Sequence, residues 1–354
     1  MISAPLLEAF RKIGGTFTYL DVGARGADPG EWKHLGRQLG YIGFEPDASE
    51  CAKLNNPSLA ALRSWKEIYY PLALGGMEGT APFFVTADLA CASLLKPNFP
   101  TGNMLGLEKL FAIVKETKVE VTTLDAWAAA QGNPQVDFAK LDVQGLELQL
   151  IKAGQRVLEN CAAVESEVTF VPLYEGQTSF AALLQQMEQA GFEMVDLHKR
   201  YGRVGAMSYS GRGRGLLVWG DALFLRRLEQ WLTPAVSSEE NLRRLLSFLI
   251  TCDVKGLIDY GAWQAFQTLQ RQPEVFSADH RSLVEETVRR WVKDRLEPSA
   301  RLILARKILG PALRAAPVRA LLKLMWRVLA FHANANYRTA NKRVWPEDYV
   351  RLSI

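Results

Sequence analysis

The sequence lacks the features of several classes of protein. Its 354 residues include only four cysteines, which are widely spaced and form no C-x-x-C pair. This argues against a disulfide framework and against a cysteine zinc site. The four histidines have no mutual spacing typical of a metal site, so we predict no bound metal. No uncharged apolar run approaches ~18 residues, the length that could span a membrane.

The N-terminal stretch also lacks the pattern of a targeting signal. "MISAPLLEAFRKIGG" has no basic start followed by a long apolar core, so we expect no signal peptide. Unpaired cysteines fit a reducing compartment, and we therefore expect a cytoplasmic protein. The composition, 48% hydrophobic and 23% charged, is that of an ordinary globular protein with ample material for a core.

Acidic residues are scarce in the last third of the chain. Residues 1–227 carry 22 Lys and Arg against 25 Asp and Glu, whereas residues 228–354 carry 20 against 13. No acid occurs between residues 298 and 346. The formal net charge of +4 therefore combines −3 in the first part with +7 in the second. This asymmetry predicts two regions with different partners.

Strand-forming runs alternate with helical patterns up to about residue 219. β-branched and aromatic runs predict core strands, several of which end at an acid, at 16–21, 41–45, 68–74, 136–142 and 162–168. Two further extended pieces are expected at 79–87 and 118–125, and a last strand within 215–227. Helical patterns lie at 30–40, 48–54, 145–159 and 178–191. The alternation predicts a mostly parallel sheet with helices on both faces, an α/β fold.

Beyond residue 227 the pattern becomes helical, at 238–251, 255–271, 279–296, 300–309 and 317–331. We therefore predict two domains, 1–227 and a basic α-helical extension, 228–354. Its arginine stems could cover its own apolar faces, or its cations could make peripheral contact with a membrane. We predict no nucleic-acid contact, because the aromatics lie on apolar stripes instead of alternating with the cations. Formation of a homodimer through this part stays open.

The glycine turn "DVGARG" at the end of the first predicted strand indicates a ligand site. In such sheets ligands bind beyond the carboxyl ends of the strands, and Gly23 and Gly26 could let a ligand approach the backbone. The turn is not G-x-G-x-x-G, and Asp21 would repel a pyrophosphate. S-adenosylmethionine has no phosphate and carries positive charge, so Asp21 favours it over a nicotinamide dinucleotide. Glu45 ends the next strand and could accept both ribose hydroxyls of either cofactor.

Five segments occur in order: "DVGARG", "GFEPD", "LALGG", "VTTLDAW" and "FAKLDVQGLELQLIKAG". They resemble the FkbM family of S-adenosylmethionine-dependent methyltransferases, and "FVPLYEGQTSF" and "GDALFLRR" are similar to later segments. The resemblance spans roughly residues 15–227. It implies the Rossmann-like class I methyltransferase fold with a seven-stranded sheet. It also implies methylation of a hydroxyl oxygen on a sugar, glycan or related natural product. A non-catalytic scaffold in glycan assembly that keeps the fold is the alternative.

The resemblance also implies which residues bind the cofactor. Carried over motif by motif, these are Asp21, Gly23, Ala24, Gly26, Glu45, Pro46, Ala73, Ser93 and Asp142. The family often has Asp-x-Glu-Gly after the fourth strand, where this chain has "DVQG". Gln144 is neutral at that position, which favours the non-catalytic alternative. Asp125 is predicted to cap a helix that begins at Ala126.

Methyl transfer to oxygen requires that the acceptor hydroxyl be aligned with the methyl group and lose its proton. The candidate bases are Asp142, then Glu167, then Glu165. The last two lie two apart on one predicted strand, so both face the same side of the sheet. Two buried carboxylates on one face would raise the pKa of one of them into a useful range. His198 follows the sixth predicted strand and is a weaker candidate, since it stands among cations.

Two loops supply candidate contacts to a hydroxylated small-molecule or glycan acceptor. Tyr174 stands in a loop after the fifth predicted strand, where it could cover the acceptor or simply pack. Arg212 and Arg214 stand in "RYGRVGAMSYSGRGRG" and could clamp an anionic group. An ordinary long connection is the alternative for this second loop.

Overall fold

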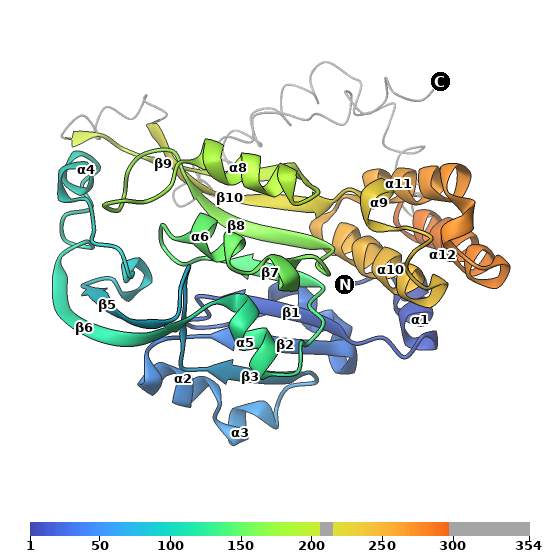
Figure 1. Cartoon of the computed structure of the whole chain (residues 1–354), viewed down its shortest axis with the longest axis horizontal. Helices are drawn as coiled ribbons and strands as arrows, with labels where there is room; N and C mark the ends of the chain where they lie inside the picture. Colours follow the sequence, from blue (N-terminus) through green and yellow to red (C-terminus); the bar gives the residue numbers. More distant parts are fainter. Residues whose placement is uncertain (206–214, 297–354) are drawn as a thin grey trace, which may run out of the picture. The chain divides into compact units, whose positions relative to one another are not determined.

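The computed structural model describes residues 1–205 and 215–296, and Met1–Leu296 form one compact unit around a seven-stranded sheet. Its strands are β1 (Phe17–Val22), β2 (Leu39–Phe44), β3 (Lys66–Tyr70), β7 (Phe138–Leu141), β8 (Ala163–Thr169), β9 (Phe192–Gly202) and β10 (Leu216–Arg226). They are ordered β3-β2-β1-β7-β8-β10-β9 (Figure 1). The first five are parallel, and β10 is antiparallel to β8 and β9. This order confirms the predicted class I methyltransferase fold.

A second, three-stranded sheet stands at the carboxyl ends of the main strands (Figure 1). It consists of β4 (Ala73–Leu74), β5 (Gly79–Thr86) and β6 (Ile113–Thr122). The prediction of one strand over 68–74 was therefore wrong. Pro71 cannot donate a ladder hydrogen bond, so β3 ends at Tyr70. The chain then crosses to the second sheet, where Ala73 pairs with Val121.

Short helices connect the strands. They are η1 (Gly30–Gln38), α2 (Ala48–Leu54), α3 (Pro57–Ala60), η2 (Leu89–Cys91), α4 (Phe99–Met104), α5 (Leu124–Ala130), α6 (Glu147–Lys152), α7 (Gln155–Leu158) and α8 (Phe180–Gln189). The single helix predicted over 145–159 is divided at Gly154, where a Cβ would lie 2.8 Å from the Leu124 side chain. The predicted cap was also wrong, because Thr123 caps α5 and Asp125 accepts hydrogen bonds from the first turn of α7.

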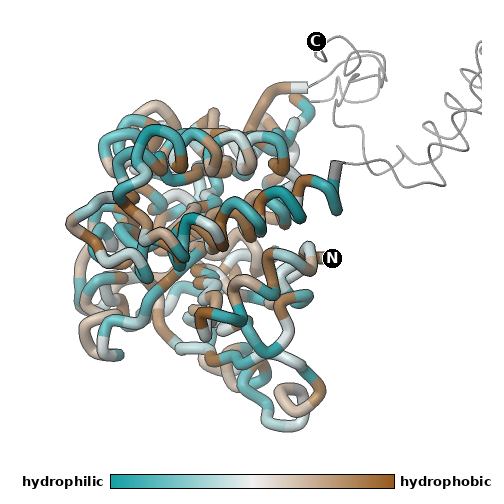
Figure 2. The backbone as a smooth tube through the Cα atoms, turned by 90° about the vertical axis from the view of Figure 1, so that its right-hand side faces the viewer, coloured by the Kyte–Doolittle hydropathy of each residue, from teal (hydrophilic) through white to brown (hydrophobic). Residues whose placement is uncertain are grey.

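Helices gather at the opposite end of this unit, beyond the amino ends of β1 and β7 (Figure 1). They are α1 (Ala4–Lys12), α9 (Leu228–Trp231), α10 (Ser238–Lys255), α11 (Ile258–Arg271), η4 (Pro273–Val275) and α12 (Ala278–Leu296). Hydrophilic and hydrophobic residues alternate along them (Figure 2). The helices predicted at 238–251, 255–271 and 279–296 are confirmed, and those at 300–309 and 317–331 lie outside the described residues. None of the helices in residues 1–205 and 215–296 has the length and hydropathy needed to cross a membrane.

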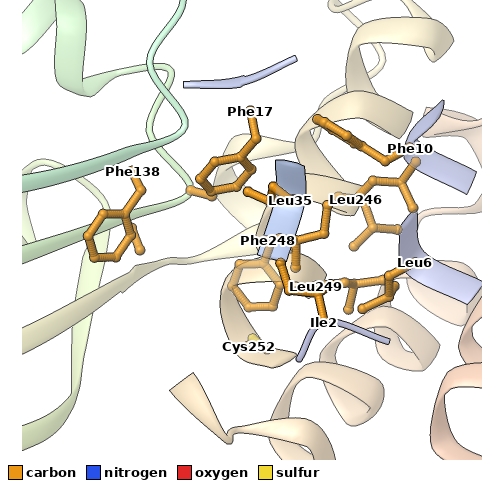
Figure 3. Packing of buried hydrophobic residues seen from close by; sticks show 14 of the residues in the cluster. Ile2, Leu6, Phe10, Phe17, Leu35, Phe138, Leu246, Phe248, Leu249 and Cys252 are labelled. Atoms are coloured by element: carbon orange, nitrogen blue, oxygen red, sulfur yellow. The ribbon is translucent and has the colours of Figure 1, made fainter. Parts of the chain in front are cut away.

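The sheet and these helices share one hydrophobic core. Phe17 of β1 and Phe138 of β7 pack in the same cluster as Phe10 of α1 and Leu246 and Phe248 of α10 (Figure 3). All five side chains are fully buried. Residues on both sides of position 228 therefore contribute to this core, and the domain boundary proposed there stays a prediction.

Hydrogen bonds of Ser3 connect the N-terminal segment to α10 and α12. The Ser3 backbone N–H donates to Asp253 of α10 over 2.8 Å, and the Ser3 hydroxyl donates to Asp294 of α12 over 2.6 Å. Asp253 also accepts from the Trp291 indole and from the Arg295 guanidinium of α12. The buried Asp253 carboxylate therefore joins the N-terminal segment, α10 and α12 in one network.

Candidate active site

A cavity of about 230 Å³ opens at the carboxyl ends of β1, β2 and β7. Its other wall comes from the second sheet and its connections: Leu72 directly precedes β4, Phe83 is on β5, and Leu89 begins η2. Six of the residues predicted to bind a cofactor line this cavity: Gly23, Glu45, Pro46, Ala73, Ser93 and Asp142. Strands far apart in the sequence thus bring these six together. Asp21, Ala24 and Gly26 belong to the same turn but are not part of the lining.

Gly23 and Gly26 of the first turn are required to be glycine for different physical reasons. Gly23 has a φ of +89°, and a Cβ there would lie 2.1 Å from the carbonyl oxygen of Asp142. Its lack of a side chain therefore permits the ends of β1 and β7 to touch. Gly26 has a φ of +64° with open space around it, so only its backbone conformation requires glycine. Ala24 is buried, and its N–H donates to the Phe44 carbonyl over 2.9 Å.

Asp21 lies beneath the cavity, and two side chains donate hydrogen bonds to its carboxylate. It accepts a hydrogen bond from the Tyr41 hydroxyl and one from the Lys140 ammonium over 3.4 Å. The same ammonium lies 3.8 Å from Asp142. Although burial lowers the pKa of Lys140, the Asp21 and Asp142 carboxylates raise it to about 12. Lys140 therefore stays protonated and compensates part of the negative charge at two strand ends.

Glu45 ends β2 as a buried acid with 3% of its surface exposed. It accepts from the Asp47 N–H over 2.8 Å, and the Arg25 guanidinium lies 3.6 Å away. Burial raises the pKa of Glu45, against the opposing effects of the Asp47 N–H and Arg25. Asp47 caps α2, and the Ser49 hydroxyl helps to lower its pKa to about 2. The turn after β2 therefore fixes the direction in which Glu45 faces the cavity.

The side-chain amide of Gln144 donates a hydrogen bond to each of two candidate bases. Gln144 Nε2 donates to Asp142 Oδ1 over 2.7 Å and to Glu167 Oε2 over 2.9 Å. The Tyr174 hydroxyl donates to Gln144 Oε1 over 2.6 Å. Burial and the Asp142 carboxylate raise the pKa of Glu167. The strand positions of the two acids predicted both as candidate bases. The contacts of Gln144 with Glu167 and Tyr174 were not predicted, because these residues are distant from it in sequence.

The remaining candidates have other surroundings. Glu165 forms an ion pair with Lys255 of α10, so the structure does not join it to the other two acids. Tyr174 is 1% exposed and directs its hydroxyl to Gln144 and to the Cys91 carbonyl. His198 lies 3.6 Å from Asp221, a half-buried acid on β10. The two arginines predicted to clamp an acceptor, Arg212 and Arg214, lie outside the described residues.

Ser93 supports the turn after β7 from the opposite wall. Its hydroxyl donates to the Gln144 carbonyl over 2.8 Å and accepts from the Leu95 N–H over 2.9 Å. This buried hydroxyl thus already uses its hydrogen as a donor and one lone pair as an acceptor within the protein. Ser93 therefore borders the cavity as part of its frame.

Residues 21–194 match the family model described as the methyltransferase FkbM domain. The chain contains an FkbM methyltransferase domain. The resemblance of its motifs to that family is therefore confirmed over these residues. Within the residues 1–205 and 215–296, no group of three or more His, Cys, Asp and Glu side chains could hold a metal ion.

Further comparisons add one curated relative and a set of solved structures. The 2-O-methyltransferase NoeI of Sinorhizobium fredii (strain NBRC 101917 / NGR234) is 34% identical over 77 residues, which are 22% of this chain and 31% of that protein. The match thus spans less than a third of that relative's length. Magnesium protoporphyrin IX methyltransferase from Synechocystis PCC 6803, with bound S-adenosylmethionine, aligns at 10% identity over 62% of this chain and 74% of its own, with a TM-score of 0.31. WbdD aligns at 12% identity over 62% and 38%, with a TM-score of 0.33.

Within the FkbM domain, Glu147 closes the turn that follows β7. Its carboxylate accepts from the Val143 N–H over 2.9 Å and from the Gly145 N–H over 3.1 Å. It is 6% exposed, and burial raises its pKa to about 7, against these backbone hydrogen bonds. Folding therefore favours the protonated form of this side chain.

We expect Glu147→Gln to change the pH dependence of stability. Because the folded-state pKa lies above the ordinary value of 4.5, the stabilising contribution of this carboxyl is complete below that value and is lost as pH rises through about 7. The free energy of unfolding of the parent protein should therefore fall between pH 5 and pH 8 more steeply than that of the variant. Urea titrations at four pH values would measure both slopes. Parallel slopes would show that Glu147 does not take up this proton.

Proposed function

We propose that this chain is an S-adenosylmethionine-dependent O-methyltransferase that acts on a hydroxyl of a sugar, glycan or related natural product. The observation that carries the proposal is the pair of carboxylates, Asp142 and Glu167, hydrogen-bonded to one amide at the rim of the strand-end cavity. The FkbM domain supports methyl transfer, and the 2-O-methyltransferase activity in the name of NoeI supports oxygen as the accepting atom.

The chemistry of the cavity fits S-adenosylmethionine. Glu45 offers a buried carboxylate at the end of β2, which suits the two hydroxyls of a ribose. Leu72, Phe83 and Leu89 offer an apolar wall that suits an adenine ring. Acids at neighbouring strand ends would oppose a pyrophosphate but favour a cofactor that carries positive charge. The fit therefore favours a sulfonium cofactor over a dinucleotide.

In this proposal the bound cofactor supplies an electrophilic methyl group, and the protein supplies alignment and proton removal. Asp142 is the first candidate for the base, because it lines the cavity and retains a half-exposed carboxylate. Glu167 shares the Gln144 amide and is the second candidate. Lys140 stays protonated 3.8 Å from Asp142, so the carboxylate that would take the hydroxyl proton has a cation beside it.

The proposal extends to the location of the protein and to the role of residues 228–354. We propose a cytoplasmic enzyme, consistent with four free cysteines. We also propose that residues 228–354 act as a separate basic extension, and that this part contacts a membrane surface or a second copy of the chain. The lack of acids between residues 298 and 346 supports the contact with anionic lipid head groups.

Calorimetry tests the cofactor assignment. Glu45→Ala should weaken the binding of S-adenosylmethionine and of its demethylated product by roughly tenfold or more, because a hydrogen bond to a charged group contributes about 1.5–3 kcal/mol. Glu116→Ala, at an exposed position of β6 that is not part of the cavity lining, is the control and should bind both ligands normally. Tighter binding of NAD than of S-adenosylmethionine by the parent protein would contradict the proposed function.

A further inference from the structure

The backbone of Gln144 is held in an unusual conformation. Its φ of +55° lies in the left-handed region, which non-glycine residues rarely occupy, and Gly145 follows with a φ of +106°. Ser93 holds the Gln144 carbonyl, and Glu147 holds the N–H groups of Val143 and Gly145. Such conformations persist only where surrounding contacts enforce them, and they cluster at functional sites. The contacts of the turn therefore fix the direction in which the Gln144 side chain points.

The contacts of Gln144 fix the orientation of its amide. Its nitrogen has two hydrogens, and these meet the carboxylates of Asp142 and Glu167. Its oxygen accepts from Tyr174, whose ring is buried. The flipped amide would set its oxygen against two carboxylates and its nitrogen against a hydroxyl hydrogen. Only one orientation thus satisfies all three partners.

We propose that Gln144 is the positioning residue of the catalytic site, which holds Asp142 and Glu167 as a hydrogen-bonded pair beside the donor cavity. The inference rests on the proposed function. One nitrogen within 3 Å of both acids donates a hydrogen bond to each. The hydrogen bond to Glu167 lowers the pKa of that acid, against the effect of its burial. A glutamate at this position would replace both donors with a third negative charge. "DVQG" is then a working variant of the turn and no longer favours a non-catalytic protein.

Other charged and titratable groups face this pair from every neighbouring element. Lys140 of β7 lies 3.8 Å from Asp142, and Asp221 of β10 and Glu147 of α6 raise the pKa of Glu167. The half-buried Cys91 thiol and the buried Tyr174 phenol lie on the remaining side, and partial or full burial raises the pKa of both. These groups are unchanged in a Gln144 variant, so a difference between variants reports on the amide alone.

The test compares two ligands that differ by one methyl group and one positive charge. The ratio of the affinities for S-adenosylmethionine and S-adenosylhomocysteine measures the negative charge near the sulfur atom. We expect the ratio for the parent protein to fall as the pair becomes protonated at low pH. In Gln144→Glu the midpoint should move upward by about one pH unit or more, because two donors are lost and one acid is gained. In Gln144→Met, which only loses the donors, the midpoint should move upward by less.

Calorimetric titrations between pH 5 and pH 9 give the three midpoints. A merely structural role predicts lower affinities for both ligands with an unchanged midpoint, and that result would overturn the inference. A ratio for the parent protein that does not vary with pH would also overturn it, because the pair would then not face the sulfur. If the parent protein binds neither ligand at any pH, it is the proposed function that fails. Similar thermal unfolding of all three proteins excludes a folding defect.

Discussion

Asp142→Asn should reduce methyl transfer far more than it reduces donor binding. Asparagine keeps the size of the side chain and can still lie beside Gln144, but it cannot accept the proton of an acceptor hydroxyl. Loss of a general base typically costs roughly 10²–10⁴-fold in rate. The measurement uses S-adenosylmethionine with a labelled methyl group and a panel of monosaccharide and oligosaccharide acceptors, with donor affinity measured separately by calorimetry.

The matched control for this experiment is Glu165→Gln. Glu165 lies two residues before Glu167 on β8, but its carboxylate pairs with Lys255 instead of the Gln144 amide. We expect its substitution to change the transfer rate by less than about tenfold, since its carboxylate is paired with Lys255 and does not contact the Gln144 amide. Equal losses of affinity and of rate in Asp142→Asn would assign Asp142 to cofactor binding instead of catalysis.

Asp137→Ala should produce the largest loss of stability. The Asp137 carboxylate is fully buried at the start of β7. It accepts from the Thr18 N–H over 2.8 Å, from Arg243 over 2.6 Å and from the Ser247 hydroxyl over 2.7 Å. Its removal leaves the Arg243 guanidinium without its closest partner, and breaking such a buried pair costs about 3–5 kcal/mol. Denaturation in guanidinium chloride would measure the change.

Two further variants separate the causes of this loss. Glu240→Ala removes the other carboxylate near Arg243. The Glu240 side chain is 28% exposed and its carboxylate lies 3.3 Å from the guanidinium, so the substitution should lower the free energy of unfolding by about 1 kcal/mol or less. Asp137→Asn keeps one acceptor oxygen and should fall between the two alanine variants. If Asp137→Ala were no worse than Glu240→Ala, the link between α10 and the sheet would not depend on this carboxylate.

Much of the fold follows from local patterns in the sequence. Runs that end in an acid placed β1, β2 and β7 correctly, since a parallel strand buried on both faces is short and apolar. The helical period placed α10, α11 and α12. Where the pattern was interrupted by one residue, prediction failed. Pro71 divides an apparently continuous strand, and Gly154 divides an apparently continuous helix.

The site was less predictable because its contacts cross the sequence. Asp21 has the right type and position for a ligand contact, but the register of β1 with its neighbours gives its carboxylate to Tyr41 and Lys140. The Gln144 side chain reaches residues 23 and 30 positions away, so no local spacing could predict these two partners. Residue type and strand position therefore identify candidate acids, whereas only tertiary structure shows which of them act together.

The network that ties Ser3 to Asp253 and Asp294 also affects how the chain folds during synthesis. The segment around Ser3 leaves the ribosome before the carboxylates that hold it, which are made some 250 and 291 residues later. Until then α1 exposes an apolar surface that includes Leu6 and Phe10, side chains that end fully buried. Nascent chains with such an unpaired surface are prone to aggregate. The segment around Ser3 thus reaches its final place only after α10 and α12 have been synthesised.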